Sequence, residues 1–293
     1  MKLIALGDNT VDLYLNTGEA FPGGNAVNVA VHAAEAGADS EYLGSFADDV
    51  WGKIMLEQLT QRGVSTAHCP ILPGTTTKSC TFNIIDGERH FLDVVTGLTW
   101  AGPIQLTPAQ LAELDTADIV VSSCNAKLPE QLAAVEALSP IFAYDFGEKE
   151  KYRTDEYYDQ VCHGIDLAQF SVPSMTDESF RAFCEPLHRR GVVHVLATMG
   201  ADGQILSNGS EILRSRGEMV KATDTMGAGD SFLAAFLCSL FDAGWQKGQP
   251  MDREPLLNAL KAGQKRSAAN CMRPGGFGCK IMFDVQNTME VGI

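Results

Sequence analysis

The chain of 293 residues is short of positive charge, with 22 Lys and Arg residues against 37 Asp and Glu residues and a formal net charge of −15. A surface of this sign repels a phosphate backbone, which argues against a nucleic-acid partner. It also disfavours binding to anionic membranes. A site for an anionic nucleotide must therefore be locally positive, through backbone N–H groups, a metal ion or a few basic side chains.

Long apolar stretches and closely spaced cysteines are also missing. No apolar run approaches the ~20 residues that span a bilayer, and Gly7, Asp8 and Asn9 cut short the apolar start at residues 1–6, so no secretory signal is expected. The eight cysteines are scattered and include no Cys-x-x-Cys pair, which argues against a cysteine-bound metal. We expect buried thiols and a cytoplasmic protein.

Two common nucleotide-binding motifs are absent as well. No Gly-x-x-x-x-Gly-Lys-Ser/Thr run occurs, which excludes a P-loop NTPase. The first expected strand is followed by Gly7-Asp8-Asn9 rather than by Gly-x-Gly-x-x-Gly, which excludes a dinucleotide-binding dehydrogenase.

Short apolar runs alternate with helical patterns along most of the chain. This alternation predicts an α/β fold, a three-layer α/β/α sandwich whose central sheet is mainly parallel. Ligands of such sheets bind beyond the carboxyl ends of the strands, where Asp8, Asp145 and Gly200 fall. The expected strands are 2–6, 42–44, 118–122, 141–146, 165–170 and 192–198, and the expected helices are 25–36, 108–114, 130–138 and 177–190.

One region departs from this alternation. Residues 75–82 and 84–93 are rich in Thr, Phe and Ile, with Asp86-Gly87 between them as a hairpin turn. With an extended segment near residues 11–21, they predict a small antiparallel β lid on a single domain that spans residues 1–293. Such a lid would exclude water from the site, although an ordinary surface hairpin has the same pattern.

We place the lid at about residues 11–21 and 70–97. Its apolar side chains, among them Phe82, Ile84 and Phe91, make a homodimer through the lid an expectation.

The most informative run is Asp224-Thr225-Met226-Gly227-Ala228-Gly229-Asp230, which an apolar segment follows. The run indicates a glycine-rich loop that opens into a buried helix, whose first N–H groups hold an anion such as phosphate. A carboxylate repels phosphate, so its presence beside the loop suggests a function. Asp230 could take a proton from an attacking hydroxyl. Phosphoryl transfer to an alcohol is the resulting hypothesis. A helix start that Asp230 merely caps is the alternative.

A second polar group lies near the N-terminus. Asn25 and Asn28 follow Gly23-Gly24 and share one face of an apolar helix, while Asp8 and Asp12 follow the first strand. Short carboxylate and amide side chains around a Gly-Gly turn suit the vicinal hydroxyls of a sugar. Alternatively, Asn25 caps the helix and Asn28 is a satisfied core amide.

With these motifs the chain resembles the ribokinase-like (PfkB) carbohydrate kinases over nearly its whole length. Residues 224–230 match the family's Asp-Thr-x-Gly-Ala-Gly-Asp motif in full. Gly23, Gly24, Asn25 and Asn28 match its N-terminal motif. Further matches are Asp48, Asp49 and Gly52 in an Asp-Asp-x-x-Gly turn, where Ala47 replaces a usual Gly, and residues 198–203 in a nucleotide loop.

The resemblance implies a carbohydrate kinase that uses ATP and Mg²⁺, with Asp230 as catalytic base and Gly227, Ala228 and Gly229 as the anion hole. It further implies roles for residues that fall into three groups. The substrate group is Asp8, Asp12, Gly23, Gly24, Asn25 and Asn28, with Arg89 of the lid facing either a substrate carboxylate or solvent; the ATP group is Lys149, Thr198, Gly200, Gly203 and Thr225; and Asp224 and Met226 would hold a monovalent cation such as K⁺.

Two further stretches depart from the family pattern. Ser174 and Asp177 stand where the family often has Asn-x-x-Glu, so Asp177 would hold Mg²⁺ through water with a shorter side chain. Lys149 stands where Arg is usual and loses the bidentate fork. These departures are the only support for an alternative, a non-catalytic protein that binds sugar or nucleotide as a regulator.

The segment from Gly7 to Asp12, the short insert before Gly23 and the run 144–146 resemble the fructoselysine 6-kinase subgroup of this family. The short insert trims the lid and leaves room for a bulky amine substituent. We therefore expect phosphorylation of a primary hydroxyl, at the 6-position, of a sugar or sugar–amine adduct such as a glycated amino acid. A fructokinase-like or ribokinase-like sugar kinase is the alternative.

Overall fold

The computed structural model describes residues 1–85, 88–97, 104–128, 131–216 and 220–285, without the side chains of Glu88 and Arg89. The strands are β1 (Lys2–Leu6), β2 (Thr10–Tyr14), β3 (Glu19–Gly23), β4 (Asp39–Leu43), β5 (Phe46–Ala47), β6 (Ile71–Leu72), β7 (Ser79–Ile85), β8 (Glu88–Val95), β9 (Ile119–Ser123), β10 (Ile141–Asp145), β11 (Leu167–Ser171), β12 (His194–Thr198), β13 (Gln204–Ser207), β14 (Ile212–Ser215) and β15 (Ile281–Met282). The helices are α1 (Asn25–Glu35), α2 (Val50–Gln61), α3 (Pro108–Leu114), α4 (Leu132–Glu136), α5 (Asp155–Val161), α6 (Asp177–His188), α7 (Ala228–Asp242) and α8 (Arg253–Cys271).

The main sheet has the strand order β14-β13-β12-β11-β10-β9-β1-β4. Its strands from β12 to β4 are parallel, whereas β13 and β14 form an antiparallel extension that the sequence patterns did not indicate. Because side chains alternate along a strand, Leu3 and Ala5 enter one apolar core while Ile4 and Leu6 enter the other. A strand buried on both faces therefore consists of apolar residues throughout.

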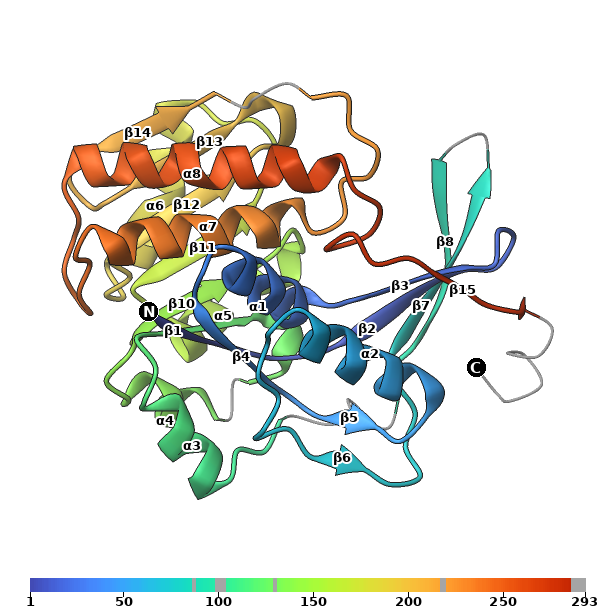
Figure 1. The fold of residues 1–293 in the computed structure, drawn as a ribbon. Helices are drawn as coiled ribbons and strands as arrows, with labels where there is room; N and C mark the ends of the chain where they lie inside the picture. Colours follow the sequence, from blue (N-terminus) through green and yellow to red (C-terminus); the bar gives the residue numbers. More distant parts are fainter. Residues whose placement is uncertain (86–87, 98–103, 129–130, 217–219, 286–293) are drawn as a thin grey trace.

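Helices cover both faces of this sheet, as Figure 1 shows. One core lies between the sheet and α1, α2, α7 and α8, and the other lies between the sheet and α3, α4, α5 and α6. These layers confirm the expected α/β/α sandwich. The carboxyl ends of β1 and β10 bring Asp8 and Asp145 to one edge of the sheet, toward the start of α1.

A smaller sheet with the order β15-β3-β2-β7-β8 projects from this body, on the right of Figure 1. It is built from residues 10–23 and 79–95, which fall near the segments expected to form a lid, and from β15, which was not expected. Its strands β2 and β7 pair in parallel, so the sheet is not antiparallel throughout. The expected turn at Asp86-Gly87 lies outside the described residues.

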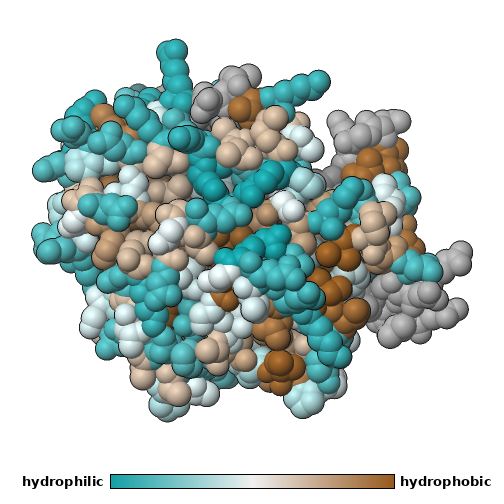
Figure 2. Space-filling model, in the orientation of Figure 1, coloured by the Kyte–Doolittle hydropathy of each residue, from teal (hydrophilic) through white to brown (hydrophobic). Residues whose placement is uncertain are grey.

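Large apolar side chains are exposed on the smaller sheet. They include Phe91 (60%) and Leu92 (48%) on β8 and Met282 (65%) on β15. Figure 2 shows apolar residues toward this side of the molecule, whereas polar residues cover much of the helical layer. Within the described ranges, no helix is long and apolar enough to cross a membrane. All eight cysteines are free thiols.

The packing of α7 against α8 yields a test of the fold. A Cβ atom on Gly263 of α8 would lie 2.7–2.9 Å from ring atoms of Phe232 on α7. Gly263→Ala should lower the free energy of unfolding by about 1–2 kcal/mol, because an overpacking cost of about 2–3 kcal/mol outweighs the roughly 1 kcal/mol gain in helix propensity. Urea unfolding measures this change.

Asn258→Ala is the matched control, since Asn258 is an exposed residue of the same helix. Its stability should stay within about 0.5 kcal/mol of the wild type or rise slightly. A Gly263→Ala protein as stable as the wild type would show that α7 and α8 are not packed at this distance.

Candidate active site

A glycine allows the start of α1 to lie close to the end of β1. Gly24 has φ 111° and precedes the first residue of α1. A Cβ atom there would lie 2.8 Å from the carbonyl oxygen of Asp8. Only glycine allows both this backbone conformation and this approach, so Gly24 sets Asn25 and Asn28 beside the residues that follow β1.

Both asparagines reach the same carboxylate. Nδ2 of Asn25 donates to Oδ1 of Asp230 (2.7 Å), and Nδ2 of Asn28 donates to Oδ2 (2.7 Å). Asn25 also donates to Oδ2 of Asp145 (2.8 Å) at the end of β10. The two motifs that the sequence singled out, about 200 residues apart, therefore meet, and the amides fix the orientation of the Asp230 carboxylate.

Burial makes this carboxylate basic. Desolvation raises the pKa of Asp230 to about 7, with further increases from the neighbouring charges of Asp145 and Asp8, although the amides of Asn28 and Asn25 oppose the shift. Desolvation likewise raises the pKa of Asp145 to about 6, against the hydrogen bonds from Gly147 and Asn25. A carboxyl group with a pKa near neutrality can take up a proton at physiological pH.

Three buried oxygen acceptors of this cluster have no hydrogen-bond partner within the described part of the protein: Oδ1 of Asp8, Oδ1 of Asn25 and Oδ1 of Asn28. Buried acceptors without donors are costly and uncommon in native proteins. They indicate a missing ligand that carries O–H or N–H donors.

Lys78, which the sequence did not single out, forms an ion pair with Oδ2 of Asp8 at 2.5 Å. Burial opposes its charge, but the attraction of Asp8 outweighs burial and raises the pKa of Lys78. Asp12 on β2 adds to that shift and thus lies near the same cluster. Lys78 directly precedes β7, which pairs with β2. This pairing joins segments far apart in the sequence, so no local pattern indicates it.

The glycine-rich loop that ends at Gly229 directly precedes Asp230 in the chain. Gly227 precedes α7 with φ 68°, and a Cβ atom there would lie 2.5 Å from the carbonyl oxygen of Gly276. The N–H of Ala228 donates to the carbonyl of Thr225 (3.2 Å), so in this structure that amide is not free for an anion. Among the described residues, no partner is found for the N–H of Gly229.

A cavity of about 880 Å³ opens on the other side of this loop. Its lining includes Ala228 and Gly229 but not Asp230, whose carboxylate faces α1 instead. Of the residues expected to bind ATP, Thr198, Gly200 and Thr225 line the cavity, together with apolar side chains such as Phe232 and Val220. The first turn of α7 thus separates the cavity from the cluster around Asp230.

Charged side chains that the sequence did not indicate also line the cavity: Glu148, Glu150 and Arg153. Arg153 pairs with Glu150 at 2.7 Å and donates to the carbonyl of Ser171 at 2.6 Å. The two carboxylates offer the oxygen ligands that Mg²⁺ prefers. They come from the loop after β10, where the sequence pattern singled out Lys149 and not these residues, so only the folded chain reveals them.

Other expected residues lie elsewhere. Asp177 begins α6 and pairs with Arg214 at 2.5 Å, and it does not line the cavity. Lys149 is exposed, and neither it nor Gly203 lines the cavity. Arg89 lies in β8 opposite Ile84, with its side chain outside the described part of the chain.

Asp224 and Met226, expected at a monovalent cation, tie loops together. The carboxylate of Asp224 accepts the N–H groups of Met226 and Gly275, both at 2.9 Å. The carbonyl of Met226 accepts Nδ2 of Asn270 at 2.9 Å. This arrangement holds the loop before α7 against the loop that contains Gly276.

A buried histidine that no motif marked holds that second loop. His32 of α1 donates from Nε2 to the carbonyl of Gly276 (2.9 Å) and accepts at Nδ1 from Nε of Arg266 (3.2 Å). Desolvation lowers the pKa of His32 to about 3, so the ring stays neutral. Arg266 in turn contacts Glu35. This network holds the Gly276 carbonyl close to Gly227.

The turn at Asp48 and Asp49 has a structural role. Asp49 caps α2 by accepting the N–H of Gly52 (2.7 Å), and it also accepts the N–H and hydroxyl of Thr77 (2.6 and 2.7 Å). Asp48 accepts the N–H of Gly74 at 2.9 Å. The turn therefore fastens the segment that leads into β7 and Lys78.

A family model described as pfkB family carbohydrate kinase matches residues 1–280. The chain is 32% identical over 252 residues to the fructoselysine 6-kinase of Escherichia coli (strain K12), covering 86% of this chain and 92% of that protein. It is 28% identical over 279 residues to the fructosamine kinase FrlD of Bacillus subtilis (strain 168), covering 95% and 93%.

Solved structures show the same fold. The Arabidopsis thaliana ribokinase complexed with ribose and ATP superposes with a TM-score of 0.80 at 20% identity, covering 99% of this chain and 98% of that one. The fructokinase with bound ATP from Xylella fastidiosa gives 0.76 at 17% identity, covering 99% and 97%.

The contact between Gly227 and Gly276 can be tested with a matched pair of variants. Gly227→Ala combines a left-handed backbone with a clash, whereas Gly244→Ala, at φ 90°, would meet no atom within 4 Å. The control should lose only about 1–2 kcal/mol of stability, the cost of the left-handed conformation. Gly227→Ala should lose more and also lose the catalytic activity, as unfolding and turnover assays measure. Equal effects of the two substitutions would contradict the close approach.

Proposed function

The chain belongs to the pfkB family of carbohydrate kinases, and from this premise we propose that it transfers the γ-phosphoryl group of ATP to the 6-hydroxyl of a fructosamine, a ketose joined to an amine. The observation that carries the proposal is the set of unpartnered acceptors around Asp230. Vicinal hydroxyls of a sugar supply the donors that Asp8, Asn25 and Asn28 lack.

In the proposed reaction Asp230 accepts the proton of the attacking hydroxyl. The amides of Asn25 and Asn28 aim its carboxylate, and burial gives it a pKa of about 7. The sugar oxygen then attacks the γ-phosphorus in line, with the nucleotide leaving toward the cavity beyond the first turn of α7. General-base assistance of this kind contributes roughly 10²–10⁴-fold in rate.

The start of α7 would stabilise the transferring group. The N–H of Gly229 points from the positive end of a helix, where charge on a phosphoryl oxygen is favoured. Ala228 can join it only if its bond to the Thr225 carbonyl opens, so we propose that phosphate binding breaks this 3.2 Å bond.

The cavity suits ATP in size and lining. Apolar side chains, among them Phe232, can cover the adenine ring of ATP. Thr198, Gly200 and Thr225 can approach its phosphates. Glu148 and Glu150 fit Mg²⁺, which keeps several water ligands and takes few carboxylates. We propose these two residues as its holders, in preference to Asp177, because both line the cavity and Asp177 does not. The ion supplies charge neutralisation along the phosphates when it is bound.

The choice of a fructosamine rests on two observations. The chain is similar over most of its length to proteins named fructoselysine 6-kinase and fructosamine kinase. In addition, carboxylates gather around the unpartnered acceptors, since the charges of Asp145 and Asp8 act on Asp230 and those of Asp8 and Asp12 act on Lys78. Excess negative charge favours the ammonium of a sugar–amine adduct over a neutral sugar.

Two further expectations remain predictions within this proposal. A monovalent cation would lie at Asp224 and the Met226 carbonyl, which keep lone pairs beyond the hydrogen bonds that they accept. A homodimer would cover the exposed apolar side chains of β8 and β15.

Replacing the base provides the first test. Asp230→Asn should fold and bind ATP but turn over at least about a hundredfold more slowly, the lower end of a general-base contribution. Asp242→Asn, at the exposed end of the same helix, should keep wild-type turnover. Steady-state assays with ADP detection measure both. Near wild-type turnover by Asp230→Asn would rule out Asp230 as the base.

The substrate is tested by comparing three ligands. Fructoselysine should have a kcat/KM at least about tenfold above that of fructose, a difference of about 1.4 kcal/mol. A fructose 1-ether of similar length has no positive charge at the linkage, so its kcat/KM should be as low as that of fructose. If the ether matches fructoselysine, length rather than charge selects the substrate. If none of the three is phosphorylated, the proposed substrate class is wrong.

A further inference from the structure

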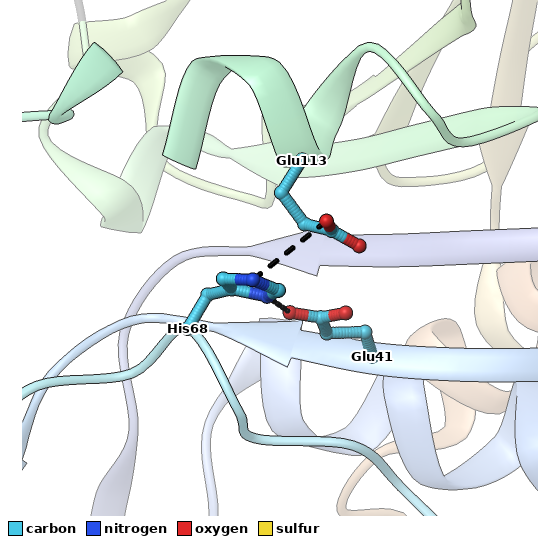
Figure 3. A group of neighbouring side chains, drawn as sticks. All are labelled: Glu41, His68 and Glu113. Atoms are coloured by element: carbon cyan, nitrogen blue, oxygen red, sulfur yellow. Dashed lines mark hydrogen bonds and ion pairs between the residues drawn. The ribbon is translucent and has the colours of Figure 1, made fainter. Parts of the chain in front are cut away.

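Away from the active site, a histidine lies between two glutamates that come from different elements (Figure 3). Glu41 lies on β4, His68 follows α2, and Glu113 lies on α3. Nδ1 of His68 is 2.7 Å from Oε1 of Glu41, and Nε2 is 3.7 Å from Oε2 of Glu113. One ligand atom from each of the three side chains lies within 4.8 Å of the others.

The backbone holds this cluster in place. Ser65 pairs with β4 at Glu41, and its carbonyl accepts the N–H of Tyr42 at 2.9 Å. Gln110 of α3 donates to the carbonyl of His68 at 3.0 Å. The three side chains therefore meet because β4, the loop and α3 are fastened to one another, and the cluster is largely preorganised.

Glu41 is the member that most needs a cation. It is 4% exposed, and its only ion pair among the described residues is with His68. Glu113 is different, because Lys2 contacts its Oε1 and leaves Oε2 directed at His68. A buried carboxylate is costly unless a cation or hydrogen bonds compensate it, so Glu41 is suited to hold a metal ion.

Open space adjoins the histidine. His68 lines a cavity of about 570 Å³ together with Gln105, Thr107 and Gln110. This space gives a metal ion a route of entry and room for water ligands. Neither the nucleotide cavity nor the Asp230 cluster shares these residues, so the site is separate from the proposed reaction.

We propose that Glu41, His68 and Glu113 bind a divalent transition-metal ion such as Zn²⁺. An imidazole nitrogen with two carboxylates suits zinc and its neighbours, whereas Mg²⁺ and Ca²⁺ take oxygen ligands only. Bonds of about 2.0–2.2 Å place two zinc ligands roughly 3–4 Å apart, so small side-chain rotations bring the three groups onto one ion. The ion takes the place of the proton between His68 and Glu41 and joins α3 to the edge of the sheet.

Equilibrium dialysis of the full chain, stripped with a chelator, tests the site. The wild type should bind one Zn²⁺ that His68→Gln and Glu41→Gln bind at least tenfold more weakly. His163→Gln is the matched control, because His163 is exposed and its Nε2 lies 2.8 Å from the Asp159 carbonyl, and it should bind like the wild type. Zn²⁺ at a hundredfold excess over Kd should raise the wild-type Tm by about 5 °C.

Glu113→Gln keeps the test decisive if the buried variants fold poorly, since Glu113 is more exposed and should also weaken Zn²⁺ binding. Unchanged Zn²⁺ affinity in His68→Gln or in Glu113→Gln would overturn the proposal, as would a wild type that binds no Zn²⁺. Binding of Mg²⁺ as tightly as Zn²⁺ would also overturn it, because a site that uses the His68 imidazole should prefer Zn²⁺. Kinase turnover of His68→Gln without zinc should match the wild type, so failure here is distinct from failure of the proposed reaction.

Discussion

The active site depends on one carboxylate that two amides hold in place. Asp230 lies in the first turn of α7, and the side chains of Asn25 and Asn28 each donate to one of its oxygens. This geometry uses up both donors that face Asp230 and leaves the carbonyl oxygens of the asparagines without partners. In the proposed reaction, the same contact orients the base and provides acceptors for the substrate. Because burial and hydrogen bonding shift the pKa of Asp230 in opposite directions, that pKa stays near 7.

Close backbone contacts keep α1 and α7 at the distance that this carboxylate requires. Gly24 lets α1 begin against the Asp8 carbonyl, and Gly227 lets α7 begin against the Gly276 carbonyl. His32 then fixes Gly276 from within α1. A Cβ atom at Gly24 or Gly227 would displace the start of α1 or α7 and so disturb the hydrogen bonds of Asn25 and Asn28 to Asp230. Stability and catalysis share these contacts, so substitutions here should affect both.

The sequence predicted what local chemistry specifies. Alternating apolar runs indicated the parallel strands β1, β9, β10, β11 and β12, and α3 begins and ends at the expected residues. The family resemblance implied that Asn25, Asn28 and Asp230 belong to one site, and the structure brings them together. Contacts that depend on long-range pairing were missed. Lys78 reaches Asp8 only because β2 pairs with β7, and β15 joins the smaller sheet from the far end of the chain. Asp177, at a motif position, pairs with Arg214 and lies outside the cavity lining, so its expected role at Mg²⁺ stays a prediction.

Titration of the Asp230 carboxyl group tests the central claim most directly. Carbon-13 NMR of protein labelled at aspartate carboxyl carbons, compared with Asp230→Asn to assign the signal, reports the pKa of this one group. A midpoint near 7 is expected from its burial beside Asp145 and Asp8. A midpoint near the ordinary value of about 4 would mean that solvent or another charge reaches the carboxylate, and that Asn25 and Asn28 do not hold a buried base.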